Sequence, residues 1–143
     1  MRRTLLAIIM MSAFAAGGMS LAQHDEHGKG GDYVKLLSQM DIIEKLDGKK
    51  AKATMVEVTL APGQVEAAHR HPGSFGYVLE GEYEWAVDDN QPRVLTAGDT
   101  FYEPTGCLHG VGRNPSKTNM ARFIAVVLHP EDAKDIVIPE KKK

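Results

Sequence analysis

Two histidines separated by one residue, His69 and His71, are the first place where the sequence could carry chemistry. In an extended strand alternate side chains point to the same side, so both imidazoles would face one way and Arg70 the other. Two ring nitrogens directed at a common point suit a divalent metal ion. The same spacing also fits two histidines on a polar surface strand, so the pair alone leaves both interpretations open.

A third histidine, His109, lies in the segment GDTFYEPTGCLHGVGRN, which begins at Gly98. This segment and HRHPGSFGYVLEGE at 69–82 resemble the two motifs of the cupin family. The first family motif is G-x5-H-x-H-x3/4-E-x6-G, and the second is G-x5-P-x-G-x2-H-x3-N. The first is matched by Gly63, His69, His71 and Gly81, and the second by Gly98, Pro104, Gly106 and His109, with Asn114 one residue late.

The resemblance covers residues 33–129 and implies an all-β fold, a single cupin double-stranded β-helix that forms a jelly-roll-like barrel. It also implies one divalent metal ion per chain, bound inside the barrel by His69, His71 and His109. Imidazole ligands leave the identity of the ion open among Fe, Zn, Cu, Ni and Mn. Because many cupins are dimers, the resemblance makes a homodimer a further expectation.

The chain departs from the first motif at the acidic position. The family places a glutamate three or four residues after the second histidine, where this chain has Phe75 and Gly76. Counting back from Gly81 by the family spacing reaches Ser74, whose neutral hydroxyl is a poor ligand for a divalent ion. The sequence therefore predicts three neutral imidazoles and water around an ion that keeps its full charge, which would make it a strong Lewis acid.

Four further residues are candidates near this site. Cys107 precedes His109 by two residues and is an extra soft ligand, a redox-active thiol or, as favoured, a small buried apolar side chain. Glu103 is either a proton-transferring group or, as favoured, a charge at the rim or surface. Tyr83 and Trp85 share one face of a strand and either line a ligand pocket or, by default, pack in the core.

Short apolar runs separated by turn residues must position these side chains. Such runs are typical of an all-β sandwich or barrel. A single turn of helix is expected at 128–136, where a proline is followed by two acids. The expected strands span residues 33–37, 53–60, 75–81, 82–87, 93–104 and 118–128.

The N-terminal 22 residues have the pattern of a secretory signal peptide, with a basic start, an apolar run and small residues before a cut near Ala22. An uncleaved membrane anchor is the alternative interpretation, although the apolar run is short for a membrane span. Residues 23–32 read as a flexible linker, with His24 and His27 as a weak metal-capturing pair. The cupin domain is expected at 33–140 and a solvated basic tail at 141–143. The protein should thus be exported, in the periplasm, with no membrane span after cleavage.

Removal of residues 1–22 would leave a net charge of about −4, since that segment holds two arginines and no acid. No basic patch interleaved with aromatic residues occurs, which argues against nucleic acid as a partner. Glu66, Arg70, Glu80, Asp88 and Asp89 read as solvated charges.

A metal-dependent enzyme acting on a small organic molecule is the first functional hypothesis, either dioxygenase-like or isomerase-like. No residue is assigned as the catalytic acid or base. The alternative is a non-catalytic module that binds or senses a metal or a small ligand.

Overall fold

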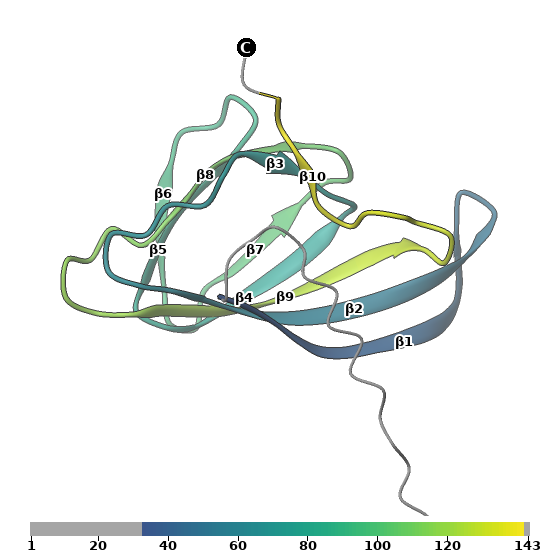
Figure 1. Ribbon diagram of the computed structural model, residues 1–143, viewed down its shortest axis with the longest axis horizontal. Coiled ribbons are helices and arrows are strands. Elements are labelled where there is room, and N and C mark those ends of the chain that lie inside the picture. The colour runs from purple at the N-terminus through teal and green to yellow at the C-terminus, as the bar shows by residue number, and fades with distance from the viewer. Residues whose placement is uncertain (1–32, 142–143) are drawn as a thin grey trace, which may run out of the picture.

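The computed structural model describes residues 33–141, which form two five-stranded antiparallel sheets facing each other (Figure 1). Sheet A has the strand order β1-β2-β9-β4-β7, and sheet B has the order β10-β3-β8-β5-β6. The strands are β1 (Val34–Leu46), β2 (Lys49–Leu60), β3 (His69–Arg70), β4 (Ser74–Glu80), β5 (Glu82–Val87), β6 (Arg93–Thr96), β7 (Thr100–Glu103), β8 (Leu108–Arg113), β9 (Ala121–Pro130) and β10 (Ile138–Pro139). The all-β double-stranded β-helix expected from the sequence is therefore confirmed. The signal peptide, the linker with His24 and His27, and the last two lysines lie outside the described residues.

The first strand is much longer than the apolar run that predicted it. β1 continues to Leu46 and pairs with β2 along most of its length, although most of its side chains are exposed. A strand with both faces largely exposed has no apolar alternation for the sequence pattern to detect. The β1–β2 hairpin extends beyond the body of the barrel at the right of Figure 1.

The segment predicted as one strand over 93–104 is two strands in different sheets. β6 pairs with β5 in sheet B, whereas β7 pairs with β4 in sheet A. The turn between them is closed by Asp99, whose carboxylate accepts hydrogen bonds from the Thr96 amide at 2.7 Å and the Thr96 hydroxyl at 3.0 Å. Gly98 adopts a φ of 95° in this turn, a conformation that glycine reaches without strain. Because β7 lies in sheet A, Glu103 at its end lies in the sheet that faces β8 of sheet B.

The helical turn expected at 128–136 is wrong. β9 runs on to Pro130 because Lys52 and Ala51 of β2 still pair with His129 and Pro130. The Glu131 amide then donates to the Lys50 carbonyl at 2.8 Å, which keeps the backbone in the sheet pattern beyond the strand. Residues 33–141 contain no helix that could cross a membrane.

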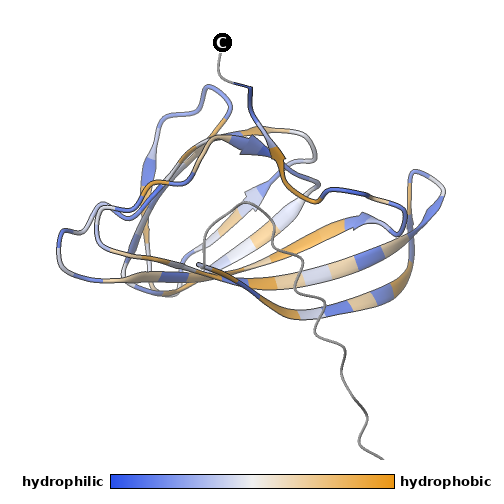
Figure 2. Cartoon of the chain, viewed as in Figure 1, coloured by the Kyte–Doolittle hydropathy of each residue, from blue (hydrophilic) through white to orange (hydrophobic). Residues whose placement is uncertain are grey.

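Aromatic rings from both sheets meet between them and form the centre of the core. The rings of Tyr83 and Phe123 stack with centroids 4.3 Å apart, and Phe101 packs against both at 5.7 Å. Apolar residues recur along β2 and β9, the strands that carry much of the opposing wall (Figure 2). The polar residues described next lie at one end of the barrel, beside this core.

Candidate metal centre

The three histidines of the two motifs converge at one end of the barrel. β3 and β8 are adjacent strands of sheet B, and His69 lies directly opposite His109 in their register. His71 follows β3, and its carbonyl accepts a hydrogen bond from the Gly106 amide at 2.9 Å. One ligand atom from each ring lies within 4.8 Å of the others. Among the described residues this is the cluster that could hold a metal ion.

Each ring has one nitrogen that is already occupied. The Nδ1 atoms of His69 and His71 lie 2.8 Å from the Ala67 carbonyl and 2.6 Å from the Pro72 carbonyl. His109 Nε2 lies 3.1 Å from the Tyr83 hydroxyl, which itself donates to Glu66 at 2.7 Å. The hydroxyl proton is thus used, so His109 Nε2 acts as the donor. Partners of this kind fix the ring orientation and tautomer of metal-binding histidines.

The nitrogens that the three rings present to a common point are therefore Nε2 of His69, Nε2 of His71 and Nδ1 of His109, and that of His71 also contacts Glu103. Their neutral imidazole form is the form that coordinates a metal. Burial lowers the pKa of His69, and burial lowers the pKa of His109 to about 4. Both rings therefore stay unprotonated near neutral pH. The donor set fits a divalent ion such as Zn, Fe, Ni or Cu.

A carboxylate lies against two of these rings, which the sequence interpretation did not favour. Glu103 is 3% exposed, so the expectation of a charge at the rim or surface is wrong. Its Oε2 lies 2.9 Å from His71 Nε2, and its Oε1 lies 3.8 Å from His109 Nδ1. It also accepts hydrogen bonds from Ser74 at 2.6 Å and from the Trp85 indole at 2.7 Å.

These contacts keep Glu103 ionised. Burial by itself would raise its pKa, but the hydrogen bond from His71, the charge of His109 and the bond from Ser74 outweigh it and lower the pKa to about 2. The same pairing has the opposite effect on its partner. Burial alone would lower the pKa of His71, yet the hydrogen bond and charge of Glu103 leave that pKa raised. Of the two interpretations of Glu103, the structure therefore supports a group next to the histidines rather than a charge at the rim or surface.

A second acid, Glu66, is half-buried and bonded to a core residue, which differs from the solvated charge predicted from the sequence. Its carboxylate accepts the Tyr83 hydroxyl bond, and burial raises its pKa to about 7. Tyr83 is fully buried, and burial together with Glu66 raises its pKa well above the usual value. The only sequence signal was position, three residues before His69, and this segment lies outside any long strand.

Three further residues from the sequence analysis are Cys107, Trp85 and Asn114. Cys107 is buried in the apolar core and its thiol pKa is raised by burial, which agrees with the apolar interpretation. Trp85 packs in the core as expected, but its indole also holds Glu103. Asn114 is buried and donates to the carbonyls of Leu60, Ala61 and Asn119, so it fixes the loop before β9 rather than the site.

Gly112 allows Glu66 and His109 to approach the backbone of β8. A Cβ added there would lie 2.3 Å from Glu66 Oε2 and 2.9 Å from His109 Nε2. We predict that Gly112→Ala displaces both groups and weakens Zn²⁺ affinity about tenfold, as expected when partners of a ligating histidine are disturbed.

Gly110→Ala is the matched control for this substitution. It lies on the same strand, and its Cβ would meet nothing closer than Leu108 Cγ at 4.0 Å. Isothermal titration with Zn²⁺ measures both variants. Equal affinities for the two would contradict the assigned packing around His109.

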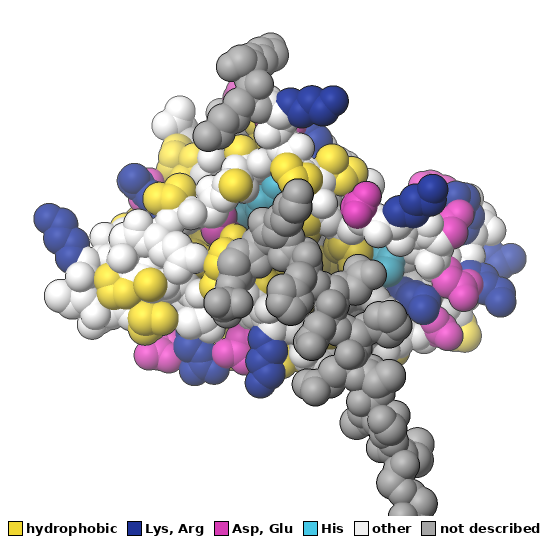
Figure 3. Space-filling view, viewed as in Figure 1, with side chains coloured by type: hydrophobic (Ala, Val, Ile, Leu, Met, Phe, Trp, Pro, Cys, Tyr) yellow, Lys and Arg dark blue, Asp and Glu magenta, His cyan; other side chains and the backbone are white. Residues whose placement is uncertain are grey.

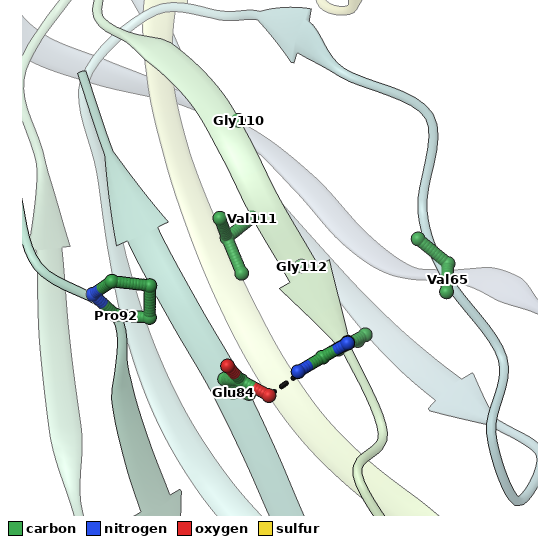
Figure 4. A pocket seen from close by; sticks show the side chains of 7 residues that line it. Val65, Glu84, Pro92, Gly110, Val111 and Gly112 are labelled. Atoms are coloured by element: carbon green, nitrogen blue, oxygen red, sulfur yellow. Dashed lines mark hydrogen bonds and ion pairs between the residues drawn. The ribbon is translucent and has the colours of Figure 1, made fainter. Parts of the chain in front are cut away.

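A surface hollow lies on sheet B, and none of the three histidines lines it (Figure 4). Glu84 and Arg113 form an ion pair of 2.6 Å across it. It is lined by Val65, Glu84, Pro92, Gly110, Val111, Gly112 and Arg113. Histidine atoms, by contrast, are visible among apolar side chains on the face shown in Figure 3, and His69 is only half-buried.

The chain is 39% identical over 64 residues to the Oryzines biosynthesis cluster protein J of Aspergillus oryzae (strain ATCC 42149 / RIB 40), covering 45% of this chain and 33% of that protein. The chain thus spans about a third of the length of this relative.

Solved structures share the fold. A conserved protein with a double-stranded β-helix domain from Klebsiella pneumoniae subsp. pneumoniae MGH 78578 superposes with a TM-score of 0.51 at 25% identity, over 75% of this chain and 86% of that one. An oxalate oxidase gives a TM-score of 0.51 at 26% identity, over 60% of this chain and 45% of that one. The family model described as the cupin domain matches residues 56–127. With both motifs, the fold and this match in agreement, the chain belongs to the cupin family.

Proposed function

We propose that this protein is a metal-dependent enzyme that acts on a small organic molecule, with His69, His71 and His109 as the protein ligands of one divalent ion. The observation that carries the proposal is the convergence of three oriented imidazoles, each of which presents one nitrogen to a common point. Such an ion, when bound, would polarise a substrate oxygen or lower the pKa of bound water.

Groups beside the histidines favour an enzyme over a module that only binds. Glu66 has a pKa of about 7, so near neutral pH it can both accept and release a proton. Its Oε2 is 2.7 Å from the Tyr83 hydroxyl, which in turn contacts His109. In this arrangement Glu66 is the group that exchanges a proton with the substrate, and Tyr83 links Glu66 to His109.

The substrate is proposed to be a small oxygen-rich compound, such as a diketone, a diol or a carboxylic acid. The likeness to an oxalate oxidase supports including dicarboxylic acids in the range. Both an oxygen-dependent cleavage and an isomerisation fit a site of this kind.

A panel of diketones, diols, thiols, uronates and dicarboxylates, tested with metal-loaded protein, decides between catalysis and binding. Oxygen uptake and product formation are recorded together, so that oxidation and isomerisation are distinguished. We expect turnover of at least one class, and loss of that turnover in Glu66→Gln with metal content retained. Tight binding across the panel without any turnover would instead identify a binding or sensing module.

Two features of the whole protein are also proposed. The first 22 residues are a signal peptide, so protein from the envelope fraction should begin at Gln23, which N-terminal sequencing checks. The second is a homodimer through the outer face of sheet A, where Phe75 and Tyr102 are both more than half exposed and their rings lie 4.8 Å apart. The molar mass from light scattering, with Tyr102→Lys as the variant, tests this contact.

A further inference from the structure

The position of Glu103 explains how this chain can lack the acidic residue of the first motif. Ser74 occupies the place that the motif spacing gives to glutamate, and it lies on β4. In the register of β4 and β7, Ser74 stands directly opposite Glu103. Cross-strand partners of this kind have Cβ atoms only about 5 Å apart. A carboxylate on β7 can therefore reach the region that a glutamate on β4 would reach.

The carboxylate is also held in a fixed orientation. Ser74 Oγ donates to Oε2 at 2.6 Å and Trp85 Nε1 donates to Oε1 at 2.7 Å, so each oxygen has one partner from the surrounding wall. Both donors are buried, at 1% and 8% exposure. Ligating carboxylates are commonly hydrogen-bonded in this way, which orients them toward the metal.

The two oxygens then face one nitrogen each of His71 and His109. Oε2 is 2.9 Å from His71 Nε2, and Oε1 is 3.8 Å from His109 Nδ1. Donor atoms that each lie about 2.1 Å from one ion are about 3.0 Å apart at a right angle and about 3.4 Å apart at the tetrahedral angle. The observed separations lie on either side of these values, so one ion could contact both rings and the carboxylate.

We propose that Glu103 is the anionic ligand of this metal centre and supplies, from β7, the carboxylate that Ser74 cannot supply from β4. This inference rests on the proposed metal site and goes beyond it. Ser74 is then a hydrogen-bond donor that orients the ligand, and its short side chain leaves the space that the Glu103 carboxylate fills. A divalent ion in the site would carry one unit of charge less than three neutral imidazoles would leave it.

The test exchanges the two side chains. Glu103→Gln and Glu103→Ser should weaken Zn²⁺ and Mn²⁺ affinity roughly 10- to 100-fold, since a charged group at the metal is lost. The double variant Ser74→Glu/Glu103→Ser returns a carboxylate to the family position and should bind at least tenfold more tightly than Glu103→Ser. Glu84→Gln, which removes a carboxylate on the outer side of β5, is the control and should bind like the wild type.

Affinity is measured by calorimetry and by the fluorescence of Trp85, the single tryptophan, which lies 2.7 Å from the proposed ligand. Circular dichroism of each metal-free variant verifies the fold. If folded Glu103→Gln binds within about threefold of the wild type, or if the folded double variant binds no better than Glu103→Ser, Glu103 is not the ligand. If the wild type itself binds neither ion, the metal site fails as a whole, a result distinct from the first two.

Discussion

His109→Ala is expected to abolish metal binding, lowering Zn²⁺ affinity by more than about 100-fold, because disturbing even a partner of a ligand costs 10- to 100-fold. His109 is the ligand from the second motif and faces His69 across the β3–β8 pair. Without it, the remaining imidazoles come from one short segment. Two histidines and one carboxylate would then be the remaining protein ligands, and a cavity would replace the ring of His109.

A second buried histidine offers a matched control. His129 is 3% exposed and His109 is 5% exposed, but His129 lies on β9 and contacts the Thr54 hydroxyl at 2.8 Å. His129→Ala should keep one metal ion per chain and lose about 1–3 kcal/mol of stability, because the buried Thr54 hydroxyl then keeps only its bond from Gln39. Metal content by elemental analysis separates the two variants. Unchanged metal content in His109→Ala would remove this histidine from the site.

Gly76→Ala is expected to destabilise the protein by about 3 kcal/mol, the upper end of the usual range for overpacking. A Cβ at this position would lie 1.9 Å from Cζ of Phe101, whose ring is buried between the sheets. Gly76 is opposite Phe101 in the same β4–β7 register that sets Ser74 opposite Glu103. Moving the ring therefore also disturbs the strand pair that presents the carboxylate.

Reducing the ring should relieve the defect. Gly76→Ala/Phe101→Leu removes the atoms that the new methyl group meets, so it should recover part of the stability lost by the single variant. Urea denaturation of metal-free protein gives the free energies of unfolding. A single variant as stable as the wild type, or a double variant that is less stable than the sum of the two single changes, would contradict the packing described.

The sequence predicted the barrel and the convergence of the three histidines because both follow from two short motifs, each formed by residues close together in the chain. His69 and His71 are neighbours in sequence, and the second motif carries His109 at a fixed distance from its turn. The acids could not be placed in the same way. Glu103 reaches the site because the chain changes sheets at Gly98 and Asp99, a crossing that a single strand over 93–104 conceals.

The position of Glu66 could not be predicted from the sequence for the same reason. Its inward direction depends on Tyr83, 17 residues later, and on the absence of a side chain at Gly112. A charged residue in a polar segment carries no local mark of such partners. Which of the chain's carboxylates lie close to the histidines is therefore determined by long-range contacts and not by residue type.

X-ray absorption at the metal edge of the loaded wild-type protein would test the arrangement most directly, since the scattering of imidazole rings counts the histidines around the ion. We predict a signal that fits three imidazoles with additional oxygen ligands, at one ion per chain. A first shell with one imidazole or none, at the same metal content, would show that His69, His71 and His109 do not share an ion.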